Sequence, residues 1–154
     1  MIRITRQTDY GILLLSQLAT RPPSEVHTAK DVARQSKISL PMVSKTLKAL
    51  ARGGLLVSQR GVKGGYRLST QASRISIGNV IEALEGPIGM TECSFNPGAC
   101  EQEGKCPVQA NWQRISVAVR DALEKIPISE LSRPRVLHPD LHLIDPSAET
   151  ARPL

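Results

Sequence analysis

The sequence predicts a mainly α-helical protein with one small β-hairpin, and three observations support this. Apolar residues recur at helical spacing in three successive segments within the first 52 residues. Two short apolar runs then flank a glycine-rich loop. A longer amphipathic segment follows a cluster of cysteines. A chain of 154 residues is long enough for one core with an extension.

Each of the first three segments has the features of a helix with a defined start. Residues 5–19 place aromatic and aliphatic side chains behind a polar first turn, which suits a helix buried in a core. Thr28 is a good N-cap for a short second helix, because Asp31 stands where a capping box places an acid. Ser39 is expected to cap a third helix over residues 40–52, which two glycines end.

The third helix is expected to have one apolar and one basic face. Its apolar stripe packs on the first two helices and consists of Leu40, Val43, Leu47 and Leu50. A helix, a tight turn and a second helix with a basic outer face form the helix-turn-helix pattern, in which the second helix enters the major groove of DNA. A helix with merely solvated lysines is the alternative. The candidate DNA contacts of this helix are Ser39, Met42, Ser44, Lys45 and Lys48.

A β-hairpin is expected directly after the third helix. Residues 55–58 and 66–69 are the predicted strands, and the glycines of the loop between them permit positive φ. In this position the hairpin would be a wing, whose backbone approaches DNA closely while its cations enter the minor groove or neutralise phosphate. An ordinary hairpin with solvated charges is the alternative. The candidate DNA contacts of the wing are Arg60, Lys63, Gly64 and Gly65.

The positive charge of the chain is concentrated in its first half. Residues 1–70 contain 12 Lys or Arg against 3 Asp or Glu, whereas residues 71–154 contain 8 against 11. A basic half-chain favours nucleic acid as a partner over a merely soluble basic surface. Only four aromatic residues occur, which predicts an aliphatic core and disfavours a base-stacking RNA platform.

Two more helices are expected in the second half. Ser76 begins a short helix over residues 77–85, and Pro107 can open a longer helix that extends to about Lys125. Apolar residues at heptad spacing in the longer helix are Val108, Trp112, Ile115, Val119, Ala122 and Ile126. Such a short seam suits pairing with a second subunit, and packing within one chain is the alternative.

The only cysteines of the chain, Cys93, Cys100 and Cys106, have the spacing C-x6-C-x5-C. The short segments between them are polar and contain glycine or proline, so the backbone can bring three sulfurs together. An odd number argues against a closed disulfide framework, and inert buried cysteines rarely gather in this way. Clustered thiolates in a reducing compartment indicate a metal or iron-sulfur site. A thiol redox switch, a zinc site and inert cysteines are the alternatives.

The chain is expected to divide into a DNA-binding domain over residues 1–86, a cluster-binding loop over 87–106, a dimerisation helix with a short C-terminal helix over 107–132, and a flexible tail over 133–154. Met1 leads straight into a polar, helix-like stretch without a signal peptide, so the cytoplasm is the expected compartment. No apolar run approaches the ~20 residues that cross a membrane.

Several short motifs lie along the first 132 residues. They are Thr8-Asp9-Tyr10-Gly11, Ile38-Ser39-Leu40, Arg60-Gly61, Gly64-Gly65-Tyr66 with Leu68, Ile77-Gly78 with Val80-Ile81, and the three cysteines followed by Trp112. Together they resemble the Rrf-type winged helix-turn-helix family of bacterial iron-sulfur transcriptional regulators, the IscR-like proteins. Residues 106–115 are most similar to the regulators of the Suf system of iron-sulfur cluster assembly, and the N-terminus is similar to nitric oxide sensors of the family.

This resemblance implies an iron-sulfur cluster, a double-stranded DNA operator and a homodimer. Both [2Fe-2S], which is slightly favoured, and [4Fe-4S] clusters need four protein ligands, so three cysteines leave one position to fill. Where IscR-like assembly regulators carry a histidine ligand, this chain has Gln109. In nitric oxide sensors of the family an aspartate of the partner subunit reaches the cluster, and Asp9 has that position here. Asp9 is therefore the expected fourth ligand, and a helix N-terminal carboxylate is the alternative. Weaker ligand candidates are Glu101, Glu103, His138 and His142.

The expected function is a transcriptional regulator of iron-sulfur cluster assembly genes, in which the state of the cluster switches DNA affinity. A nitric oxide or redox-sensing repressor of the same family is the alternative. A small iron-sulfur electron-transfer protein would need neither wing nor basic helix, and a cluster-free regulator with oxidisable cysteines is a further alternative. No His or carboxylate pair has a spacing typical of acid-base catalysis, so an enzyme is not expected.

Overall fold

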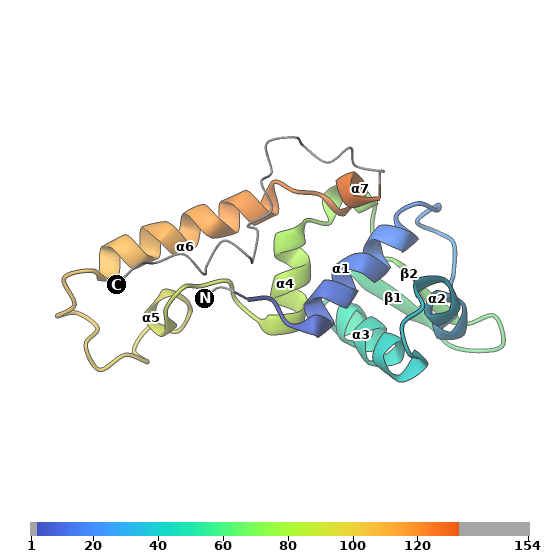
Figure 1. Ribbon diagram of the computed structural model, residues 1–154, viewed down its shortest axis with the longest axis horizontal. Helices are drawn as coiled ribbons and strands as arrows, with labels where there is room; N and C mark the ends of the chain where they lie inside the picture. Colours follow the sequence, from blue (N-terminus) through green and yellow to red (C-terminus); the bar gives the residue numbers. More distant parts are fainter. Residues whose placement is uncertain (1–2, 133–154) are drawn as a thin grey trace, which may run out of the picture.

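The computed structural model, which describes residues 3–132, has a helical body with a β-hairpin on one side and a long helix projecting from the other (Figure 1). The elements in chain order are α1 (Arg6–Leu18), α2 (Ala29–Ser36), α3 (Leu40–Arg52), β1 (Leu56–Gln59), β2 (Gly65–Leu68), the 3-10 turn η1 (Ala72–Arg74), α4 (Ile77–Glu85), α5 (Glu92–Phe95), α6 (Gln109–Glu124) and α7 (Ile128–Leu131). This order confirms the predicted mainly α-helical fold with a small hairpin wing.

The core of the body is aliphatic, as the scarcity of aromatic residues predicts. Leu14 of α1, Leu47 of α3 and Val80 of α4 are fully buried. Burial of each such side chain contributes roughly 1.5–3 kcal/mol. The prediction that Leu40 packs inward is wrong, because it occupies the first position of α3, ahead of the turns that pack on the other helices, and is 39% exposed.

The predicted helix starts are confirmed at Thr28 and Ser76, but Ser39 does not cap α3 with its side chain. The Thr28 hydroxyl accepts a hydrogen bond from the Asp31 amide at 3.2 Å and donates to the Asp31 carboxylate at 2.7 Å. Ser39 occupies the N-cap position without a side-chain hydrogen bond. Pro41 in the first turn has no N–H to donate, which removes one of the partners open to a capping side chain.

The tight turn between α2 and α3 depends on Lys37. Its backbone has a φ of 58°, the left-handed conformation that ends α2 and reverses the chain. The Ile38 amide then donates to the Ser36 hydroxyl at 3.3 Å. The short connection expected for a helix-turn-helix is thus confirmed.

The hairpin strands are each displaced by one residue from the predicted ranges 55–58 and 66–69. The Leu55 amide donates to the Leu50 carbonyl at 3.0 Å and so closes the end of α3, while the Leu55 carbonyl still accepts from the Ser69 amide at 3.1 Å. The paired residues of the strands begin at Leu56 and include Gly65 of the opposite strand.

A contact that the sequence did not reveal joins the hairpin to the loop between α1 and α2. His27 and Tyr66 exchange two backbone hydrogen bonds of 2.8 Å each. A Cβ atom on Gly65 would collide with the His27 carbonyl, so only glycine fits this close approach. The loop thereby fixes the base of the wing against the body.

The second half of the chain leaves the body and returns to it. α6 projects outward with α5 beside its far end (Figure 1). Neither α5 nor the exact start of α6 was predicted: a turn from Cys106 to Gln109 occupies the place where Pro107 was expected to open the helix. α7 then returns to the core, where Ile128 is fully buried and its amide donates to the Ile75 carbonyl at 2.8 Å. The predicted tail lies outside the described residues.

None of the helices within residues 3–132 has the length and apolarity needed to span a membrane.

Candidate functional site

A basic groove lies between α3 and the hairpin. It has a volume of about 460 Å³ and is lined by Lys45, Lys48, Ala51, Arg52, Ser58 and Tyr66. Within residues 3–132, none of its three cations forms an ion pair with a carboxylate, so all three are available to phosphate. Arg52 and Tyr66 were absent from the predicted contacts. Arg52 follows Lys48 by one helical turn, so the sequence pattern alone could have placed it on the same basic face. Tyr66 reaches the groove only through the folding of the hairpin.

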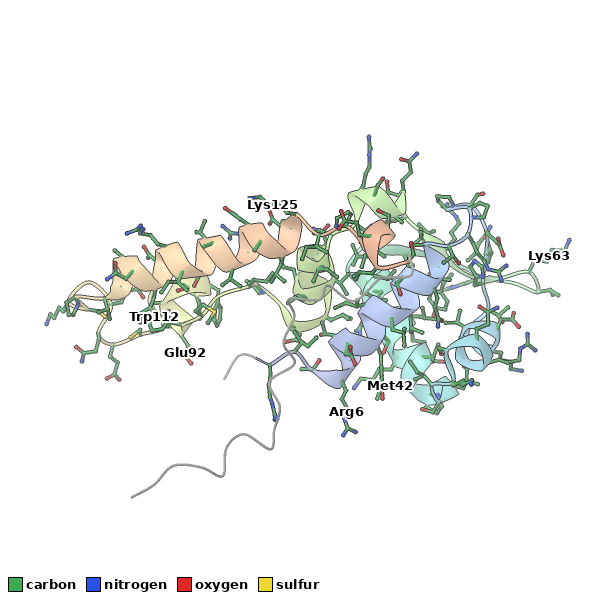
Figure 2. The ribbon with its side chains drawn as sticks, turned by 45° about the horizontal axis from the view of Figure 1, so that its top comes forward. Arg6, Met42, Lys63, Glu92, Trp112 and Lys125 are labelled. Atoms are coloured by element: carbon green, nitrogen blue, oxygen red, sulfur yellow. The ribbon has the colours of Figure 1, made fainter. Side chains whose placement is uncertain are left out.

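The other predicted contacts of α3 lie at its first turns. Ser39 is exposed, and Met42 and Ser44 are half-buried. Figure 2 shows Met42 on the side of the body away from α6. These polar and apolar side chains lie in the same first turns of α3 as the exposed Lys45.

The wing projects from the body and ends in exposed side chains. Lys63 marks its outer end in Figure 2, and neither Lys63 nor Arg60 has an ion-pair partner within the described part of the chain. Val62 between them is fully exposed, a feature that no sequence pattern predicted. The Gly64 amide closes the loop by donating to the Gly61 carbonyl at 2.9 Å. The two cations therefore stand on a short, internally bonded loop.

The three cysteines lie on one segment, but their sulfurs are not gathered. Cys93 is in α5, whereas Cys100 and Cys106 each come directly before a turn, and all three are half-buried free thiols. Among residues 3–132, no three His, Cys, Asp or Glu side chains are close enough to hold a metal ion. The donor set nevertheless fits an iron-sulfur cluster in its chemistry, since cysteine thiolates are the usual ligands of such clusters. The segment supplies suitable donors that would have to move together.

Asp9 is exposed in the first turn of α1 and is not grouped with the cysteines of its own chain. The same turn is clamped to the end of α4, because the Thr5 amide donates to the Glu85 carboxylate at 2.8 Å. Burial raises the pKa of Glu85, but hydrogen bonds from Thr8 and Thr5 lower it by more, so the pKa lies below its ordinary value. This clamp connects the turn that carries Asp9 to the residue from which the cysteine segment departs.

The weaker ligand candidates have different surroundings. Glu101 is exposed, whereas the Glu103 carboxylate accepts a hydrogen bond from the Gly98 amide at 2.6 Å. Gln109, in the first turn of α6, donates to Glu103 at 3.5 Å. Outside the described residues lie His138 and His142.

The heptad stripe of α6 is largely exposed in the single chain. Trp112 is 38% and Ile115 43% exposed, and Figure 2 shows Trp112 near the end of α6 that is farthest from the wing. The buried residue of this helix is Ser116, whose hydroxyl accepts a hydrogen bond from the Met90 amide at 3.0 Å. The stripe therefore lies beside the buried face and leaves an apolar surface uncovered.

Known proteins that are similar to this chain in sequence include transcriptional regulators. The HTH-type transcriptional regulator IscR of Vibrio vulnificus is 29% identical over 130 residues, which cover 84% of this chain and 77% of that protein. Protein rrf2 of Nitratidesulfovibrio vulgaris is 27% identical over 138 residues, 90% of this chain and 92% of its own.

Solved structures of regulators are similar to this chain in fold. CymR, the global cysteine regulator of B. subtilis, matches with a TM-score of 0.67 and 28% identity over 86% of this chain and 97% of its own. IscR of T. potens shares the fold, with a TM-score of 0.61 and 21% identity over 84% of this chain and 85% of its own.

These relatives confirm that the chain is a DNA-binding regulator and not an enzyme. A sequence model described as "Rrf2: Iron-dependent Transcriptional regulator" matches residues 4–134. Since this match extends over most of the chain, the protein belongs to the Rrf2 family of transcriptional regulators.

Proposed function

We propose that this protein is an iron-sulfur cluster-dependent regulator that binds double-stranded operator DNA as a homodimer in the cytoplasm and controls iron-sulfur cluster assembly genes. The observation that supports this most is the succession of three features in one molecule. A basic winged surface is followed by a three-thiol segment and then by a helix with an uncovered apolar stripe. In this proposal the winged surface binds DNA, the three-thiol segment senses the signal, and the apolar stripe pairs two subunits.

The DNA-binding part of the proposal places α3 in the major groove. Lys45 and Lys48 would face the DNA together with the first turn of the helix, which contains Ser39, Met42 and Ser44. Arg60 would enter the neighbouring minor groove, and Lys63 would neutralise phosphate. Gly64 and Gly65 would let the wing backbone approach closely. The absence of ion pairs at the basic residues, within the part of the chain that the structure describes, supports this arrangement.

The sensing part of the proposal assigns the ligands. Cys93, Cys100 and Cys106 would hold the cluster, [2Fe-2S] rather than [4Fe-4S], and Asp9 of the partner subunit would complete the set. A bound cluster would supply iron that reacts with oxygen or nitric oxide. Asp9 would hold iron more weakly than the thiolates do, so the carboxylate position is the one open to exchange. The clamp at Glu85 would pass a movement of the cysteine segment to α1 and so to the DNA-binding body.

The decisive experiment is anaerobic purification followed by native mass spectrometry of the wild type and of Cys100→Ala and Asp9→Ala. We expect a coloured dimer whose mass shows the cluster, loss of iron in Cys100→Ala, and a labile cluster in Asp9→Ala. Glu82→Ala, which changes an exposed carboxylate of α4, serves as the control. A colourless wild type with stoichiometric zinc would contradict the proposal.

A second candidate function is thiol-based redox sensing without a cluster. It is favoured by the three free, half-buried cysteines, which belong to no metal-holding group of side chains in the described residues. CymR of Staphylococcus aureus has been solved in an oxidized form, with a TM-score of 0.63 and 29% identity over 88% of this chain and 99% of its own. Operator binding that changes upon mild oxidation of iron-free protein, with loss of free thiols, would support this candidate over the first.

A further inference from the structure

Glu103 bridges parts of the cysteine segment that belong to different loops. One carboxylate oxygen accepts a hydrogen bond from the Gly98 amide at 2.6 Å, and the other accepts from Gln109 Nε2 at 3.5 Å. Gly98 lies between the first two cysteines, Glu103 between the last two, and Gln109 begins α6. One side chain therefore ties both loops to the start of the long helix.

The bond from Gly98 is the strong member of this network. A hydrogen bond of 2.6 Å from an amide to a carboxylate is charge-assisted and roughly twice as strong as a neutral one. Gly98 has a φ of 87°, a conformation that side chains of L-residues disfavour. Gln109 adds longer contacts, since its Oε1 also accepts from the Gly104 amide at 3.4 Å.

These hydrogen bonds exist in an arrangement in which the three sulfurs, within residues 3–132, do not form a group that could hold a metal ion. A contact made in one of two conformations shifts the equilibrium toward that conformation. We propose that Glu103, supported by Gln109, is a latch that stabilises the open cysteine segment and opposes its closure around metal. The inference rests on the proposed cluster site and adds a regulation to it. The latch makes the segment bind a cluster less readily and lose a bound cluster more readily.

The first test uses metal-free, reduced protein and therefore does not depend on a cluster. In Glu103→Ala, hydrogen exchange at the Gly98 amide should accelerate about tenfold, because a hydrogen bond to a charged group is lost. Dibromobimane, which joins neighbouring thiols, should cross-link the cysteines several times faster than in the wild type. Gln109→Ala should show smaller changes in the same direction. Gln102→Ala is the control, since this exposed side chain next to Glu103 is no ligand candidate and makes no hydrogen bond within residues 3–132.

The second test uses cluster-loaded protein prepared anaerobically. Loss of the cluster to a chelator should be slower in Glu103→Ala than in the wild type and unchanged in Gln102→Ala. Faster loss or slower cross-linking in Glu103→Ala would show that the carboxylate preorganises the site, and would overturn the latch. Unchanged exchange at Gly98 would overturn it as well. If the wild type takes up no cluster while cross-linking rises as expected, the proposed function fails and the latch stands.

Discussion

Lys63 stands at the outer end of the wing without an ion-pair partner among the described residues, which makes its role measurable. We expect Lys63→Ala to weaken binding to all DNA sequences alike, because a phosphate contact carries no sequence information. The slope of log affinity against log salt should fall by about 0.9, the contribution of one neutralised phosphate. Fluorescence anisotropy over a salt series measures both quantities.

The control for this prediction is Lys125→Ala. Lys125 is also exposed, but it lies at the end of α6, and Figure 2 shows it apart from the wing. An unchanged salt slope in Lys63→Ala, or an equal change in Lys125→Ala, would exclude Lys63 as a phosphate contact.

The lowered pKa of Glu85 predicts that the stability of the protein depends on pH. Its pKa in the folded protein lies below the ordinary value of 4.5, because hydrogen bonds from Thr8 and Thr5 favour the carboxylate. A group whose pKa is lowered by folding stabilises the protein above its unfolded pKa, and this contribution is lost as the pH falls through the folded pKa. Glu85→Gln should therefore lower the free energy of unfolding at neutral pH, by no more than about 1 kcal/mol at this exposed site.

Urea unfolding at a series of pH values checks the sign. The difference between wild type and Glu85→Gln should shrink toward zero as the pH falls below 4.5. Glu82→Gln, an exposed neighbour on α4, should show no such difference. A Glu85 effect that grows on acidification would contradict the assignment.

At the scale of elements, α3 offers two leucines of one stripe with different burial. Leu47 is fully buried, whereas Leu40 is 39% exposed. Leu47→Ala should lower the free energy of unfolding by about 2–5 kcal/mol, because it leaves a cavity among packed helices. Leu40→Ala should have a much smaller effect. Similar losses in the two variants, measured by urea unfolding, would mean that the first turn of α3 is buried in solution, for instance by a partner.

The uncovered face of α6 gives a prediction about the dimer. Ile115 belongs to the heptad stripe and is 43% exposed, and Val117 on another side of the helix is 44% exposed. Ile115→Glu should shift the dimer to monomer at micromolar concentration, because it places a charge in an apolar interface. Val117→Glu should leave the dimer intact. Analytical ultracentrifugation distinguishes these outcomes, and equal dissociation in both variants would contradict the stripe as the interface.

At the scale of the whole molecule, the cysteine segment lies between the DNA-binding body and the helix proposed to dimerise. If the segment is the input, the change in operator affinity between loaded and metal-free protein should be about 5–150-fold. Linkage requires operator DNA to change cluster retention by the same factor. Anisotropy titrations and iron dissociation with and without operator measure the two factors. Equal operator affinity of the two forms would remove the segment from the switch.

Much of the body was predictable because its signals are local. The cap at Thr28 needs only Asp31 three positions later, and the buried Leu47 belongs to a periodicity visible within one helix. The failures occurred where a second local feature competed with such a signal. Pro41, two residues after Ser39, has no N–H for the serine side chain to accept from, and the Leu55 amide donates to Leu50 at the end of α3.

The candidate site was predictable as a set of residues and less so as an arrangement. Lys45, Lys48 and Arg60 carry their chemistry in any conformation, and the spacing of three cysteines is a property of the sequence alone. That the sulfurs stand apart, and that Glu103 lies between the loops that carry them, depends on how the loops turn in space.

The sequence by itself determined most of the helices, the presence of the hairpin, the basic half and the donors of a thiol site, because periodicity, capping and charge are properties of short windows. Only the tertiary structure decided how these parts are joined. The His27–Tyr66 bridge fixes the wing, and the bond from Thr5 to Glu85 connects residues 80 positions apart. Such contacts form when segments that are distant in the sequence pack onto one core, so no local sequence pattern predicts them.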